Sequence, residues 1–169
     1  LLSSANIINI SSEELLKAAC CNLAESFETT PSIDVNFSDA ISGRKQINML
    51  GLSSPNILMS VENIPSIRGA LQSFGLTYIP GTWIESLQVA KGSGSVVNGY
   101  ESISGQINTE LRKPLTDDKF FLNLFANQME RLELNAHYTS SLNNKLDHGL
   151  YFHTNKKTTS ADNNNDGFR

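Results

Sequence analysis

Three alternating segments after Pro114 constrain the fold of this chain more than any other feature of its sequence. In each segment every second residue is apolar over about ten residues, and short polar turns separate the segments. Because successive side chains of a strand point to opposite faces of a sheet, the pattern predicts antiparallel strands with one apolar face. The apolar residues are Phe120, Leu122, Leu124 and Ala126, then Leu132, Leu134, Ala136 and Tyr138, and finally Leu150 and Phe152.

The same alternation fits two kinds of sheet. A strand of about ten residues is long enough to cross a lipid bilayer when it is tilted, as in a membrane β-barrel. A soluble antiparallel meander also alternates, with its apolar face on a core and its polar face in water. The pattern alone leaves both interpretations open.

The composition describes a chain that buries a core and does not bind nucleic acid. The 169 residues are 39% hydrophobic and 18% charged, with a formal net charge of −4. Because no run of Lys and Arg forms a basic patch, nucleic acid is excluded as the main partner. No apolar stretch reaches the ~18 residues that a membrane-spanning helix needs. The chain begins at Leu1 without Met or a signal peptide and stops in loop-like sequence, so we expect part of a longer, processed protein.

The sequence of residues 1–113 predicts an α+β domain of short mixed strands and one long helix. The helix is expected over Ser11–Phe27, because Ser11 and Glu14 form a capping box in front of an amphipathic run. The alternating pattern begins after Lys113-Pro114, so residues 119–169 are expected to form a second region. Short strands are expected at 7–10, 33–37, 45–50, 56–64, 87–89 and 106–111, with Pro65 closing the strand at 56–64 and a loop at 69–83.

The sequence contains no arrangement typical of an enzyme. A phosphate-binding loop needs a lysine after its glycines, whereas Lys91 precedes Gly92. A dinucleotide fingerprint also fails, because Val97 stands at its third glycine position. All three histidines fall in the late alternating segments, away from the serines of the first region. Cys20 and Cys21 are adjacent on the predicted helix, which favours one core thiol and one flanking thiol over a metal or redox pair.

One stretch carries a partial metal-binding pattern. Asp162, Asn164 and Asp166 stand at positions 1, 3 and 5 of a calcium-type loop, and Gly167 follows at position 6. The sequence stops before the acidic ligand that such a loop carries at position 12, and no helix precedes the stretch. A calcium site and an Asx-rich polar loop without metal both stay open, and no other cofactor is expected.

Residues 84–111, with the sequence IESLQVAKGSGSVVNGYESISGQINTEL, resemble the end of the plug domain of TonB-dependent outer-membrane receptors. That family shows an Ile-Glu pair, a strand, an Arg/Lys-Gly turn and a closing strand of the form GGVINI. The stretch NILMSVENIPSIRG resembles the preceding plug strand, whereas QINMLGL lacks the arginine that the family carries before Gly51. The positions of the plug motif are Pro65, Arg68, Gly69, Glu85, Lys91, Gly92, Gly99, Gly105 and Asn108.

The resemblance implies an α+β plug domain at 1–113, followed at 119–169 by the first antiparallel β-strands and an outer loop of a truncated transmembrane β-barrel. The glycines would let the plug backbone turn sharply and approach the inner wall of the barrel. The calcium-type stretch would open an outer loop, and the polar alternate residues of the strands would face the barrel lumen. These lumen residues are Asn123, Asn127, Arg131, Glu133, Asn135 and His137.

The resemblance also implies a function. It places the protein in the lipid of the outer membrane of a Gram-negative bacterium, as a receptor of the Bacteroidetes type. Such a receptor binds an extracellular siderophore, cobalamin, metal or glycan. It imports this substrate when the inner-membrane protein TonB pulls on a segment outside this chain. A soluble periplasmic α+β ligand-binding module is the alternative, with 119–155 forming a sheet on the first region.

Overall fold

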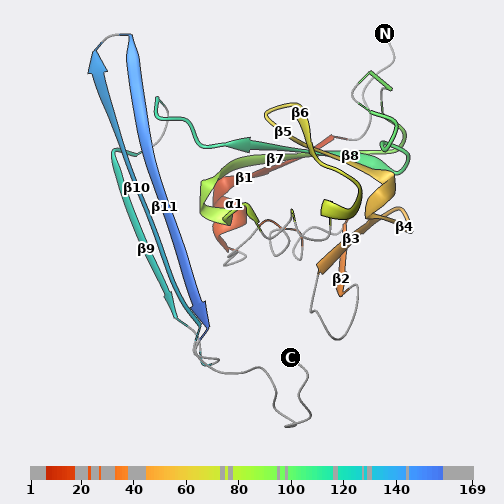
Figure 1. The fold of residues 1–169 in the computed structure, drawn as a ribbon, viewed down its shortest axis with the longest axis horizontal. Coiled ribbons are helices and arrows are strands. Elements are labelled where there is room, and N and C mark those ends of the chain that lie inside the picture. Colours follow the sequence, from red (N-terminus) through yellow and green to blue (C-terminus); the bar gives the residue numbers. More distant parts are fainter. Residues whose placement is uncertain are drawn as a thin grey trace. The chain divides into compact units, whose positions relative to one another are not determined.

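The structure is a computed structural model that describes residues 7–17, 23, 27, 33–37, 45–72, 75, 78–94, 96–97, 99–115, 118–126, 128, 131–143 and 145–157. The chain divides into two compact units, residues 1–111 and residues 112–169. The first unit is a mixed sheet with short helices, and the second is an open antiparallel sheet (Figure 1). No helix in the described part of the chain is both long enough and apolar enough to span a membrane.

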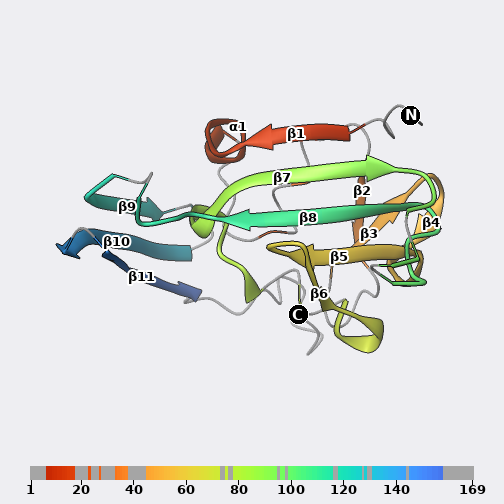
Figure 2. The same ribbon diagram turned by 90° about the horizontal axis from the view of Figure 1, so that it is seen from above.

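The first unit is built on a five-stranded sheet, which Figure 2 shows from above. The strand β8 lies at its centre, pairing in parallel with β5 and antiparallel with β7. The strands in spatial order are β1 (Ile7–Ser11), β7 (Ile84–Lys91), β8 (Gly105–Leu111), β5 (Ile57–Val61) and β6 (Ile64–Ile67).

A smaller sheet and several short helices complete the first unit. The smaller sheet contains β2 (Asp34–Phe37), β3 (Lys45–Met49) and β4 (Leu52–Ser53). The helices are α1 (Ser12–Lys17) and the single-turn 3₁₀ helices η1 (Ser54–Asn56), η2 (Gly69–Leu71) and η3 (Gly81–Trp83).

Alternation along the strands places the hydrophobic core on one face of the larger sheet. Met59, Ile107 and Val89 lie opposite one another on β5, β8 and β7, and none is more than 2% exposed. Leu15 of α1 and Met49 of β3 belong to the same buried cluster, so both elements pack on this face. The remaining buried members are Ile10, Leu23, Phe27, Ile33, Ile47, Ile57, Ile67, Ile84 and Leu87.

The predicted capping box is confirmed at the start of α1. The Ser11 N–H donates to Glu14 Oε2 over 3.2 Å, and the Glu14 N–H donates to Ser11 Oγ over 3.5 Å. Most of the predicted helix beyond Lys17 falls outside the described residues. Leu23 and Phe27 are described and fully buried, in agreement with the predicted apolar face of that helix.

The single strand predicted at 56–64 is wrong. The chain reverses at Glu62 and Asn63, whose φ angles of 52° and 62° make a two-residue hairpin turn between β5 and β6. Pro65 does not close a strand but lies inside β6, opposite Ser60. The turn is held from β8, because the Glu62 N–H donates to the Thr109 carbonyl over 2.9 Å.

The second unit confirms the three alternating segments as antiparallel strands. They are β9 (Phe120–Ala126), β10 (Arg131–Asn143) and β11 (Leu146–Lys157), with β10 in the middle. Leu134 lies opposite both Leu124 and Thr154, so the register keeps the alternate residues of the three strands on common faces.

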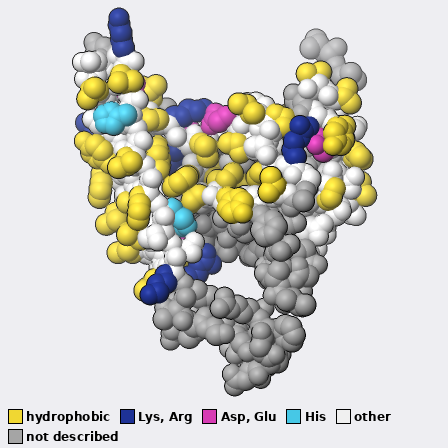
Figure 3. Space-filling model, viewed as in Figure 1, with side chains coloured by type: hydrophobic (Ala, Val, Ile, Leu, Met, Phe, Trp, Pro, Cys, Tyr) yellow, Lys and Arg dark blue, Asp and Glu magenta, His cyan; other side chains and the backbone are white. Residues whose placement is uncertain are grey.

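The apolar face of the second unit is exposed along its length. Leu124 is 74% exposed and Leu150 is 71% exposed, although both belong to the apolar set of the alternation. Hydrophobic side chains gather over these strands in Figure 3. An exposed apolar patch of this kind normally marks a surface that a membrane, a protein or a ligand covers, because contact between apolar side chains and water is unfavourable. The expectation that lipid covers this face stays a prediction.

The positive φ angles of the β5–β6 turn generate a stability prediction. Asn63→Ala and Asn63→Gly both remove the polar side chain, but only alanine has a Cβ that clashes with the backbone at a φ near 62°. We expect Asn63→Ala to be less stable than Asn63→Gly by about 1 kcal/mol, as measured by urea unfolding of the chain. Equal stabilities of the two variants would contradict the assigned turn.

Candidate functional site

The structure brings some of the predicted motif positions together and leaves others apart. Arg68 and Gly99 are in contact, and Pro65 and Asn108 line the same small cavity. Lys91 and Gly105 are paired residues at one end of the β7–β8 ladder. Gly69 has a φ of 57° with open space around its Cα, and Glu85 lies half-buried on β7.

An ion pair joins the segment before η2 to the loop between β7 and β8. Arg68 Nε donates to Glu101 Oε1 over 2.8 Å, and Arg68 Nη2 donates to Glu101 Oε2 over 2.9 Å. This two-pronged geometry is the strongest that arginine makes with a carboxylate. The Glu101 side chain is only 8% exposed, whereas the Arg68 side chain is 46% exposed.

The ion pair explains the glycine at position 99. A Cβ there would lie 2.6 Å from Glu101 Oε2 and 2.8 Å from Arg68 Nη2. The φ of Gly99, 150°, is also one that other residues rarely adopt. Any side chain at this position would therefore push the two charged groups apart.

Arg68 and Glu101 shift each other's titration. Hydrogen bonding from Arg68 lowers the pKa of Glu101, against the effect of burial, which raises it. The same hydrogen bonding, with the charge of Glu101, raises the pKa of Arg68. Both shifts favour the charged forms, so the ion pair is the stable state near neutral pH.

The glycine-rich loop, residues 92–104, is closed by a hydrogen bond at its base and is also bonded to the residue that precedes β5. At its base the Gly92 N–H donates to the Ser104 carbonyl over 2.8 Å. The backbone amides of Ile103 and Ser104 and the Ser104 hydroxyl all donate to the Asn56 carbonyl, over 3.0–3.1 Å. Three donors on one carbonyl oxygen tie this loop to the start of β5.

Gly105 is required by close packing inside the first unit. A Cβ at Gly105 would lie 2.6 Å from the Ala90 carbonyl oxygen and would overlap the Met49 sulfur. The sequence predicted that such glycines approach a barrel wall. The close contacts of Gly99 and Gly105 are instead with atoms of the first unit itself.

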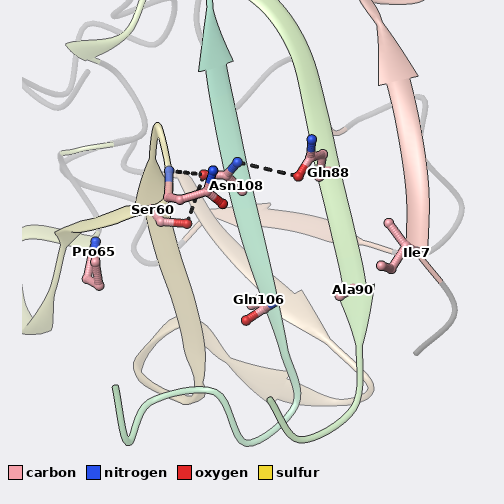
Figure 4. A pocket seen from close by; sticks show the side chains of 8 residues that line it. Ile7, Ser60, Pro65, Gln88, Ala90, Gln106 and Asn108 are labelled. Atoms are coloured by element: carbon pink, nitrogen blue, oxygen red, sulfur yellow. Dashed lines mark hydrogen bonds between the residues drawn. The ribbon is translucent and has the colours of Figure 1, made fainter. Parts of the chain in front are cut away.

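Asn108 is the centre of a hydrogen-bond network on the sheet face opposite the core. Figure 4 shows it between Ser60 and Gln88, on the strands to either side of β8. Its Oδ1 accepts from the Asn63 N–H over 2.8 Å and from the Ser60 hydroxyl over 3.1 Å. Its Nδ2 donates to Glu110 Oε1 over 2.8 Å and to Gln88 Oε1 over 3.4 Å. One side-chain amide thus holds three strands and the β5–β6 turn.

The cavity beside Asn108 is too small for a metabolite. It measures about 60 Å³ and is lined by Ser60, Asn63, Gln88 and Gln106, among others. Small-molecule sites usually measure about 300–1,000 Å³, whereas one water takes about 30 Å³. The network around Asn108 is therefore a structural device and not a substrate pocket.

The polar face of the second unit carries its own chain of hydrogen bonds. Glu133 Oε1 accepts from Asn135 Nδ2 over 2.9 Å, and Asn135 Oδ1 lies 2.6 Å from His153 Nδ1. The ring of His137 stacks on Phe121 with centroids 5.0 Å apart. Glu133, Asn135 and His137 are all buried, and all lie on the face opposite the apolar one.

Some residues of the site were missed by the sequence analysis. The sequence gives no signal for the roles of Glu101 and Asn56, although Glu101 is the one carboxylate of the glycine-rich loop. Within the described residues, no group of three or more His, Cys, Asp or Glu side chains is placed to hold a metal ion. Residues outside the described ranges are the predicted calcium ligands Asp162, Asn164 and Asp166, the predicted lumen residue Asn127, and the adjacent Cys20 and Cys21.

The sequence of the chain is similar to those of known proteins. The family model of the TonB-dependent Receptor Plug Domain matches residues 2–106. The Vitamin B12 transporter BtuB of Vibrio vulnificus is 24% identical over 135 residues, covering 80% of this chain and 22% of that protein.

Solved structures show the same fold. The ferric-catecholate import receptor Fiu of E. coli K12 has a TM-score of 0.74 and 17% identity, over 92% of this chain and 22% of that one. The siderophore receptor PiuA of Acinetobacter baumannii also has a TM-score of 0.74 and 17% identity, over 95% and 22%. The chain spans about a fifth of the length of these relatives. The likeness confirms the predicted fold class, a plug-type mixed sheet followed by antiparallel strands.

The Asn108 network predicts a cost for changing one amide to a carboxylate. In Asn108→Asp an oxygen replaces Nδ2 and faces the oxygens of Glu110 and Gln88. We expect a loss of about 1–3 kcal/mol in the free energy of unfolding at pH 7, measured with urea. Gln106→Glu makes the same chemical change on the same face of β8 outside this network. A similar loss in Gln106→Glu would contradict the special role of Asn108.

The lowered pKa of Glu101 predicts an acid-sensitive contribution to stability. Because the folded pKa lies below the ordinary value of 4.5, the contribution is complete above pH 4.5 and is lost as the pH falls through the folded pKa. The wild type should therefore be more stable than Glu101→Gln at pH 7, and the two should converge in acid. In an Arg68→Ala background the pH-dependent part of the difference should be absent. Its persistence there would show that Arg68 is not its cause.

Proposed function

The chain belongs to the TonB-dependent receptor plug domain family, and on this basis we propose that it is part of an outer-membrane receptor that imports an extracellular small molecule. The plug unit would close the lumen of a barrel whose first strands are β9, β10 and β11. Substrate would bind from outside, and movement of the plug would open a path inward.

The two faces of the second unit carry this proposal. A plug-type unit is followed in the same chain by strands with a largely exposed apolar face and an opposite face whose polar residues are buried along β10. Strands of a transmembrane barrel need this division, because one face meets lipid and the other meets the lumen. Among the described strands, β9 and β11 each pair only with β10, and further strands would continue the sheet from their outer edges.

Energy for import would come from TonB in the inner membrane, acting through a segment N-terminal to the plug. The position of β1 supports this route, because it is an edge strand that pairs only with β7 among the described strands. An edge strand leaves a sheet at a lower free-energy cost than a central strand, since only one ladder of hydrogen bonds breaks. Force applied from the N-terminal side would thus reach an edge strand first.

The proposed cargo is a metal chelate of the siderophore or cobalamin class. The names of the relatives support this choice over a free metal or a glycan, because they describe a vitamin B12 transporter, a ferric-catecholate import receptor and a siderophore receptor. The glycine-rich stretch supports the finer proposal of a Bacteroidetes-type receptor. The Asx-rich stretch at 162–166 supports a calcium site in an outer loop.

The alternative of a soluble periplasmic module has less support. A soluble sheet would bury its apolar face, whereas Leu122, Leu124 and Leu150 are each more than half exposed. No observation among the described residues favours that module over the receptor.

An uptake assay tests the proposal. Cells with and without the full-length protein are given a radiolabelled ferric catecholate siderophore or radiolabelled cobalamin, with and without a protonophore. We expect uptake of one of them to require the protein and to fall to background with the protonophore. Uptake that needs the protein but persists without the proton-motive force would contradict energy coupling. Absence of both uptakes would overturn the proposed cargo class.

A further inference from the structure

The Arg68–Glu101 ion pair links two segments that the sheet does not otherwise hold together. Arg68 follows β6, at the outer edge of the five-stranded sheet, and Glu101 lies in the glycine-rich loop beyond β7. The two residues are 33 positions apart in sequence. Among the described residues, β6 and the glycine-rich loop share no strand pairing, and the two side chains make this connection.

The described side chains at the far end of the loop are exposed, beyond a hydrogen bond in which the Gly94 N–H donates to the Ser102 carbonyl over 3.0 Å. Val96 is 84% exposed and Val97 is 89% exposed, and the side chain of Tyr100 is exposed as well. The hydrogen bonds to the Asn56 carbonyl hold only the returning end of the loop, at Ile103 and Ser104. Glu101 lies between the exposed tip and this held end, at the position where a contact decides whether the tip is fixed.

The chain is built around this contact. Gly99 leaves the space that the paired groups occupy, since its missing Cβ would lie within 3 Å of both. The Arg68 guanidinium also lies 6.0 Å from the centre of the Tyr100 ring, within reach of a cation–π contact. The arginine therefore lies next to three consecutive residues of the loop, which are Gly99, Tyr100 and Glu101.

We propose that Arg68 and Glu101 form a latch that fixes the glycine-rich loop to the segment between β6 and η2, so that these two parts of the plug move as one body. Release of the latch lets the glycine-rich loop move relative to the segment that follows β6, while the paired strands stay intact. This inference rests on the proposed function in one respect, because the latch affects import only if the plug moves. The latch itself is a property of the resting protein.

Hydrogen exchange of the full-length receptor in detergent tests the latch directly. Peptides covering the loop (92–104) are compared with peptides covering β7 (84–91), in wild type, Arg68→Ala, Glu101→Gln and the double variant. We expect loop amides to exchange about tenfold faster in each single variant, with no further increase in the double variant. The β7 amides should exchange at the wild-type rate throughout.

Two further variants sharpen the test. Arg68→Lys keeps the positive charge but loses the two-pronged geometry, so its loop should exchange at an intermediate rate. Glu13→Gln makes the same chemical change as Glu101→Gln at an exposed position in the first turn of α1, away from the loop, and should leave loop exchange unchanged.

Several outcomes would overturn the latch. Loop exchange at the wild-type rate in both single variants would show that the ion pair does not fix the loop. Effects that add in the double variant would show that the two residues act independently. Equal acceleration in β7 would make the pair a general stabiliser of the unit. Because no transport is measured, failure of the latch is distinguishable from failure of the proposed import function.

Discussion

The pairing of β8 with both β5 and β7 is the constraint on which the rest of the first unit depends. Along β8, Ile107 points into the hydrophobic core and is fully buried, while the next residue, Asn108, holds the polar network on the other face. The strand begins at Gly105, where any side chain would collide with the Ala90 backbone. Three of the first four residues of β8 thus meet separate requirements for close approach, apolar burial and hydrogen bonding, and a shift of one position would break them all.

The regular features of the fold could be predicted from sequence because they follow local rules. Alternation fixed β9, β10 and β11, since a period of two assigns each side chain to a face without reference to the rest of the chain. The capping box at Ser11 and Glu14 is likewise a pattern of four consecutive residues. The glycine-rich stretch was recognised by its resemblance to a family, whereas the physical reason for its glycines came only with the structure.

The features that were missed depend on contacts between distant residues or on unusual turn chemistry. The turn at Glu62 and Asn63 lacks the glycine that normally marks such a hairpin, and β8 supplies the compensating hydrogen bonds from more than 40 positions away. Arg68 and Glu101 carry no local signal of being partners. The resemblance to a family did predict the kind of molecule, but the loop-to-strand connections that organise the first unit were not visible in the sequence.

The mass of the intact native protein shows whether this chain is part of a large outer-membrane receptor. The protein would be extracted from the source organism's membranes with detergent, and its mass measured. We predict a detergent-dependent species several times heavier than the 18.5 kDa of this chain, found in the outer-membrane fraction. A water-soluble species near 18.5 kDa would contradict it, because so short a chain cannot supply the strands of a closed receptor barrel.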